Sequence, residues 1–107
     1  MRKHGRHAPA FILLMLSKKS NHGLGILNDL NDFIEGNKLD TAIIYRVLKK
    51  LETEGAIDAH WEDSASGPKK KVYSITEKGR DLLTEFRKDI EASRNRLDKF
   101  IKMYDED

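Results

Sequence analysis

The spacing of hydrophobic positions changes along the 107-residue chain. Within residues 8–34, and again within 41–53, apolar residues recur every three or four positions, which places them on one face of an α-helix. Within residues 57–75 they alternate with polar residues, as in amphipathic β-strands. From residue 77 the helical spacing returns and continues almost to the C-terminus. The chain is therefore expected to be mainly α-helical with one small β-hairpin, an α+β fold.

The helix with the clearest limits lies between Asp40 and Gly55. Asp40 is a favourable N-cap, and Gly55 can adopt the left-handed conformation that ends a helix. The apolar face carries Ile44, Val47, Leu48 and Leu51. The opposite face presents Ala42, Arg46, Lys49, Lys50 and Thr53, with Tyr45 on its flank. A cationic face with small residues near its start is typical of a helix that enters the major groove of DNA, and a plain solvated face is the alternative.

Two helices are expected before this one. Residues 8–16 have a proline in the first turn and are apolar on nearly all sides, which predicts a helix at the centre of the core. After a polar loop at 17–21, residues 22–34 have helical spacing, with His22 expected to cap or pack at their start. Two glycines follow His22 closely, which suggests the close approach of another backbone. A turn at 35–38 then completes a helix-turn-helix unit.

Residues 57–62 and 70–75 predict two strands, joined by a turn-rich segment at 63–68. Trp61 alternates with polar residues and is expected in the core or in an interface, with ligand stacking as the alternative. Three consecutive cations are expected at the hairpin tip: Lys69, Lys70 and Lys71. A basic hairpin directly after such a helix indicates the wing of a winged helix-turn-helix domain, whose tip lies along the phosphate backbone.

The last helix is expected to begin after Thr76, a natural N-cap, and its apolar residues follow the alternating steps of a coiled-coil seam. At about 1.5 Å per residue it is about 40 Å long, more than a small domain can cover. We therefore expect a homodimer through this helix, with the first helix contributing. The expected dimerisation residues are Phe11, Leu14, Leu83, Phe86, Ile90, Leu97, Phe100, Ile101 and Tyr104. Residues 1–76 would form the winged helix-turn-helix domain, with 1–7 as a flexible basic arm, and 77–107 the dimerisation helix.

Composition narrows the possible functions. The net charge is only +2, but three cations and no anions lie between Thr41 and Lys50. The chain has no cysteine and no long apolar run, so we expect a cytoplasmic protein without a membrane partner. No nucleophile with a base, no phosphate loop and no metal-ligand cluster is apparent, and His4 and His7 are expected to be solvated. We expect neither an enzyme nor a cofactor or metal site.

Three motifs together resemble the PadR family of transcriptional regulators, and most closely its short subfamily with a single C-terminal helix. They are His22-Gly23, the run from Ile44-Tyr45 through Leu51-Glu52-Thr53-Glu54-Gly55-Ala56-Ile57, and the run from Gly67-Pro68-Lys69 to Thr76-Glu77-Lys78-Gly79. The resemblance covers about residues 10–83. It implies a dimeric winged-helix DNA binder, often a repressor, relieved in some members by phenolic acids or flat hydrophobic drugs near the dimer interface.

The chain departs from the family pattern at three places, one of which is Leu24, where the family often has tyrosine. Ala42-Ile43 replaces a glycine-threonine pair, so Ile43 is expected to contact a thymine methyl or the partner surface. The final helix lacks tryptophan, so the aromatic sandwich of the drug-binding members is not supported.

The sequence therefore predicts a DNA-binding transcriptional regulator, a dimeric repressor whose partners are operator DNA, a second copy and a small hydrophobic or phenolic effector. A winged-helix protein-interaction module that does not bind DNA is the alternative. The expected DNA-binding residues are Thr41, Ala42, Ile43, Tyr45, Arg46, Lys49, Lys50, Lys69, Lys70 and Lys71. We expect Arg46 to read a base and Tyr45 to bind phosphate. The alternative is that Arg46 pairs with Asp40 or Glu52 and that Tyr45 packs on the preceding helix.

Overall fold

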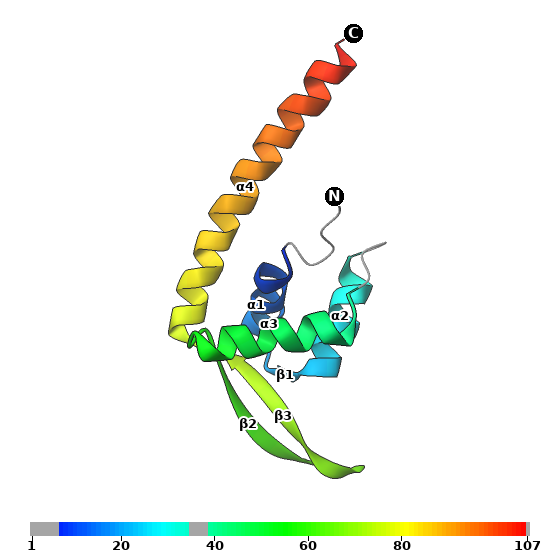
Figure 1. The fold of residues 1–107 in the computed structure, drawn as a ribbon, viewed down its shortest axis with the longest axis vertical. Coiled ribbons are helices and arrows are strands. Elements are labelled where there is room, and N and C mark those ends of the chain that lie inside the picture. Colours follow the sequence, from blue (N-terminus) through cyan, green and yellow to red (C-terminus); the bar gives the residue numbers. More distant parts are fainter. Residues whose placement is uncertain (1–6, 35–38, 107) are drawn as a thin grey trace.

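The computed structural model describes residues 7–34 and 39–106. In chain order these form α1 (Ala8–Lys18), β1 (Asn21–His22), α2 (Gly23–Phe33), α3 (Thr41–Thr53), β2 (Ile57–Ser64), β3 (Gly67–Ile75) and α4 (Glu77–Asp105). Figure 1 shows α1, α2 and α3 gathered together, with the β2–β3 hairpin extending from one side and α4 projecting from the other. The expected α+β winged helix-turn-helix fold is confirmed. The basic arm and the turn at 35–38 fall outside the described residues, except for His7.

Helix α1 lies at the centre of the core, as its apolar pattern predicts. Pro9 stands in its first turn, where a missing amide hydrogen costs nothing. Ile12 and Leu13 are completely buried, and Ile26, Leu30, Ile44, Leu48 and Ile57 join them from the surrounding elements. None of the helices within residues 7–34 and 39–106 has the length and apolar content needed to cross a membrane.

The sheet has a third strand that the sequence pattern does not reveal. β1 pairs antiparallel with β3, and Asn21 lies opposite Tyr73. The strand order is β1-β3-β2, so β3 is central and is covered on both edges. A strand of two residues is too short to show alternation, and the segment therefore looks like a polar loop in the sequence.

The hairpin is longer and its turn tighter than expected. β2 continues to Ser64 and β3 begins at Gly67, so only Ala65 and Ser66 form the turn. Gly67 has φ of +122°, which a glycine adopts without strain. The prediction of a loop over 63–68 is therefore wrong, and the three lysines lie along β3 just beyond the tip.

The start of α4 is fastened to the end of α3. Gly55 adopts φ of +82° after α3, as its place after the helix predicts. The Thr76 hydroxyl donates to the Gly55 carbonyl at 2.7 Å and accepts from the Gly79 amide at 3.0 Å. A Cβ on Gly79 would collide with the carbonyl oxygen of Ala56. The first turn of α4 therefore packs directly against the backbone that joins α3 to β2.

Helix α4 leaves the body of the domain partway along its length. Leu82, Leu83 and Phe86 pack against the core, but the apolar residues of its distal half do not. These exposed residues are Leu97, Phe100, Ile101, Met103 and Tyr104. With 29 residues, α4 is about 43 Å long at about 1.5 Å per residue. Figure 1 shows it projecting away from the rest of the domain.

Candidate nucleic-acid interface

Helix α3 presents the cationic face that the sequence predicts. The Asp40 carboxylate caps the helix by accepting from the Ile43 amide at 2.9 Å. Ile44 and Leu48 are completely buried, whereas the opposite face is exposed. That exposed face consists of Thr41, Ala42, Arg46, Lys49 and Lys50. Ile43 is half-buried against the core, so only part of its side chain is left to contact a partner.

The cations of this face are not neutralised by neighbours. Among the described residues, Arg46, Lys49 and Lys50 take part in no ion pair. Asp40 and Glu52 are the alternative partners expected for Arg46. Both are engaged elsewhere, since Asp40 caps α3 and Glu52 pairs with Lys71. The outward face of α3 therefore carries three charges available to an anionic partner.

Tyr45 packs against the first residue of α2 and remains 47% exposed. A Cβ on Gly23 would come within 2.6 to 2.7 Å of the Tyr45 ring and hydroxyl, so only glycine leaves room for the ring in this position. The neighbouring Gly25 is approached in the same way by the Asn21 side chain. The prediction that these glycines admit another backbone is wrong, because both admit side chains. His22 caps α2, as expected, with Nδ1 accepting from the Gly25 amide at 2.9 Å.

The three lysines of the wing have different surroundings. Lys69 and Lys70 are exposed, and Lys69 lies 3.7 Å from Asp63 in a solvent-exposed pair that contributes little stability. Lys71 instead turns toward α3, where its Nζ lies 3.3 Å from Glu52 Oε1. The same Nζ lies 5.5 Å from the ring centroid of Tyr73. Lys71 therefore holds the hairpin against α3 and is partly neutralised.

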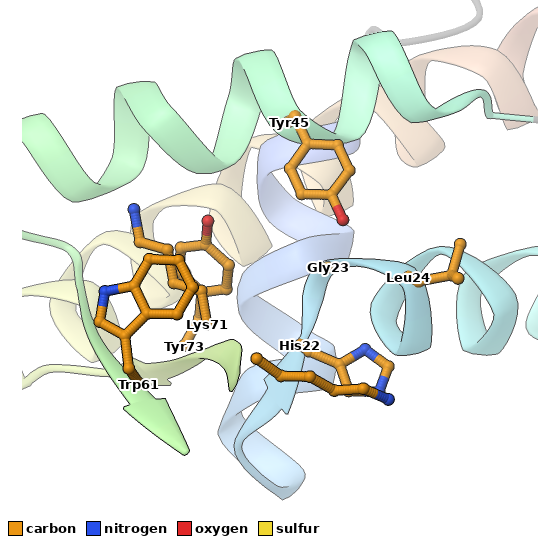
Figure 2. A pocket seen from close by; sticks show the side chains of 8 residues that line it. His22, Gly23, Leu24, Tyr45, Trp61, Lys71 and Tyr73 are labelled. Carbon is orange, nitrogen blue, oxygen red and sulfur yellow. The ribbon is translucent and has the colours of Figure 1, made fainter. Parts of the chain in front are cut away.

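A cavity of about 430 Å³ separates α3 and the start of α2 from the hairpin, and we call it the wing groove (Figure 2). It is lined by His22, Gly23, Leu24, Tyr45, Trp61, Lys70, Lys71 and Tyr73. Figure 2 shows the Tyr45 side chain extending from α3 toward Gly23, with Trp61 on the hairpin beside Lys71 and Tyr73. Burial raises the pKa of Tyr73 above its usual value of 10.0, so its hydroxyl stays protonated at neutral pH.

Trp61 does not lie in the core, although its position in the alternation suggested this. It is 64% exposed, whereas Ile57 on the same strand face is 1% exposed. The hairpin extends past the edge of the core before it reaches Trp61, and the ring therefore stands in the wing groove. Sequence alternation identified the correct face of the strand but not where the core ends.

A second cavity, of about 360 Å³, lies between α1 and α4 and is mostly apolar. It is lined by Ala10, Phe11, Leu14, Leu83, Thr84, Phe86, Arg87 and Ile90. Five of the nine expected dimerisation residues are thus brought together here: Phe11, Leu14, Leu83, Phe86 and Ile90. The other four, Leu97, Phe100, Ile101 and Tyr104, continue along the exposed part of α4, and we call these four the α4 seam.

Comparison with known proteins agrees with this arrangement. A family model described as the Transcriptional regulator PadR-like family matches residues 12–85. A protein of Lysinibacillus sphaericus described as uncharacterized protein X is 27% identical over 97 residues, which cover 90% of this chain and 89% of the relative.

Solved structures share the fold over most of its length. A PadR-like transcriptional regulator from Bacillus cereus is 25% identical with a TM-score of 0.77, over 89% of this chain and 91% of that one. A transcriptional regulator from Clostridium thermocellum is 19% identical with a TM-score of 0.80, over 88% and 92% of the two chains.

Proposed function

The chain belongs to the PadR-like family of transcriptional regulators, and from this premise we propose that it is a sequence-specific, dimeric, DNA-binding repressor. Members of this family are transcriptional regulators and not enzymes. In the proposal, residues 1–76 bind DNA and residues 77–107 join two copies. A regulator of this kind acts on the chromosome and therefore works in the cytoplasm.

The exposed cationic face of α3 is the observation that carries the proposal. Arg46 lies at the centre of this face in the N-terminal half of the helix, the part that enters a major groove in winged-helix proteins. We assign Arg46 to a base edge, where its two donors can form a bidentate contact with guanine. We assign phosphate contacts to Tyr45, Lys49 and Lys50 on the same helix and to Lys69 and Lys70 on the wing.

A second copy is the proposed partner of the α4 seam. Its apolar residues are exposed over the distal half of α4, and no part of the described chain folds back to cover them. A symmetric dimer would bury both seams against each other and place two α3 helices along one duplex.

A small hydrophobic effector belongs to the proposal because of the cavity between α1 and α4. The cavity is lined by Phe11, Leu14 and Ile90 among other residues, and it adjoins the proposed dimer contact. A ligand there would touch both the DNA-binding part and α4, and this is the arrangement needed to change one through the other.

The alternative, a protein-interaction module without DNA binding, is not favoured. Lysine is depleted at the centre of surfaces that bind ordinary proteins, although arginine is not. The α3 face instead carries two exposed lysines, Lys49 and Lys50, beside Arg46.

The deciding experiment is a fluorescence-anisotropy titration of the chain's own upstream intergenic DNA and of mixed-sequence DNA, each at two salt concentrations. Arg46→Ala should reduce the ratio of the two affinities by about tenfold, because a bidentate base contact contributes about 1–3 kcal/mol of discrimination. Lys50→Ala, one turn further along the same helix, is the matched control and should weaken both affinities in similar proportion.

Two outcomes would count against the proposal. Equal loss of both affinities in Arg46→Ala would make Arg46 another phosphate contact. Absence of binding to either DNA by the unmodified chain at low salt would favour the protein-interaction alternative.

A further inference from the structure

Three large apolar side chains are exposed in the wing groove. Trp61 is 64% exposed, Leu24 51% and Tyr45 47%, and all three line the same cavity. Exposed apolar side chains that cluster in a hollow, rather than scatter singly, mark interaction sites on soluble domains. The groove therefore has the features of a binding site, and the charges around it indicate the class of molecule that binds there.

The charges around the groove favour an anion. The described residues that line it include Lys70 and Lys71 but no carboxylate, and although Glu52 pairs with Lys71 at 3.3 Å, Lys70 is exposed and takes part in no ion pair among the described residues. Two of the three acidic residues of β2, Asp58 and Glu62, lie exposed on the strand face opposite Trp61, and the third, Asp63, lies 3.7 Å from Lys69. The side of the hairpin that faces α3 thus carries Trp61 and Lys71, which are paired across the two strands, and Lys70 reaches the groove from its edge.

The groove is also bounded by both elements to which DNA contacts are assigned. Its lining comes from α3 through Tyr45 and from the hairpin through Trp61 and Lys70. A DNA strand that touches α3 and the wing at the same time must therefore pass across the mouth of the groove. Such a strand alternates apolar deoxyribose with anionic phosphate, and the groove offers aromatic rings beside cations.

We propose that Trp61 contacts the DNA backbone, with its ring face against a deoxyribose and its indole N–H donating to an adjacent phosphate. Lys70 pairs with a phosphate of the same strand. Tryptophan suits this role because it joins a large apolar face to one hydrogen-bond donor. The inference rests on the proposed function and adds a contact that depends on shape rather than on charge or base sequence.

The chain itself supplies the probe, since Trp61 is its single tryptophan. Mixed-sequence duplex DNA of about three helical turns is added to the unmodified protein at low salt, and tryptophan emission is followed together with the anisotropy of a label on the DNA. Binding should shift the emission of Trp61 and protect it from acrylamide quenching.

Substitution then separates the ring contact from charge. Trp61→Ala should weaken DNA binding about fivefold, which is the scale of aromatic stacking against a nucleotide. The loss should be the same factor at low and at high salt, because no charge is removed. Trp61→Phe keeps a ring and should lose less. His60→Ala, on the opposite face of β2, is the matched control and should bind as the unmodified protein does. A thermal melt of each variant confirms that it folds, as expected for residues that are exposed.

The outcomes distinguish this inference from the proposed function. If the DNA label reports binding while Trp61 emission and quenching stay unchanged, or if Trp61→Ala binds like the unmodified protein, the Trp61 contact is wrong and DNA binding stands. A loss that grows smaller at high salt would make the Trp61 effect electrostatic and would also overturn the ring contact. If the label reports no binding, the proposed function fails and the inference fails with it.

Discussion

The wing groove and the α4 seam expose similar side chains but differ in the charges that border them. Lysines flank the groove, whereas the part of α4 that carries the seam has charges of both signs, with Asp98 and Asp105 beside Lys99 and Lys102. In a two-fold interface each patch meets its own copy, so an uncompensated charge would face a like charge. A balanced surface suits a second copy, and an unbalanced cationic surface suits a polyanion. The charges at the border of each surface, rather than its apolar centre, therefore indicate whether the proposed partner is DNA or a second copy.

The largest expected effect comes from placing a charge in the seam. Leu97→Asp buries a carboxylate in the proposed dimer contact, which costs several kcal/mol without a partner, and should raise the dimer dissociation constant more than about a hundredfold. Light scattering at micromolar concentration should then report a monomer. Asn95→Asp adds the same charge on the opposite side of α4 and should leave the dimer intact.

The variants Leu97→Asp and Asn95→Asp also distinguish the role of the α4 seam from that of the wing groove. Leu97→Asp should lose affinity for operator DNA because one chain reaches only one half-site, while its wing groove remains unchanged. An unmodified chain that scatters light as a monomer at micromolar concentration would show that the seam has another partner.

A smaller effect is expected at the groove from Gly23→Ala. The new Cβ would displace the Tyr45 ring, which is free to move because it is half exposed. We expect a change in unfolding free energy within about 1 kcal/mol, a several-fold loss of DNA affinity and no change in dimerisation. Gly25→Ala is the matched control, since its Cβ would meet the Asn21 side chain and not Tyr45. Equal DNA affinities in the two variants would remove Tyr45 from the interface.

The smallest effect should distinguish two neighbouring lysines. Lys70→Ala should reduce the slope of log affinity against log salt by about 0.9, the value for one phosphate contact. Lys71→Ala should change the slope less, because Glu52 already neutralises part of its charge, and should lower the unfolding free energy by about 0.5 kcal/mol. Salt titrations of both variants test this difference, and identical slopes would show that Lys71 leaves Glu52 when DNA binds.

The parts of the fold that local chemistry determines were predictable from the sequence. Asp40 and Gly55 set the limits of α3, and the buried stripe between them follows from the 3.6-residue period alone. Contacts between distant residues were not predictable in this way. Alternation already placed Lys71 and Tyr73 on one face, but the pairing of Lys71 with Glu52, 19 residues away, depends on how the hairpin folds back on α3. β1 depends likewise on a partner some fifty positions later, which no local pattern encodes.

The close approach of Gly79 to the Ala56 carbonyl fixes the start of α4 against the segment that joins α3 to β2, so that a tilt of α4 would pivot at this contact. Over a length of about 43 Å, a tilt of α4 by about 5° about this contact moves its C-terminal end by about 4 Å. In the proposed dimer that displacement becomes a change in the separation of the two α3 helices. A larger residue at position 79 would push α4 away from Ala56 and should therefore alter which half-site spacing the proposed dimer accepts.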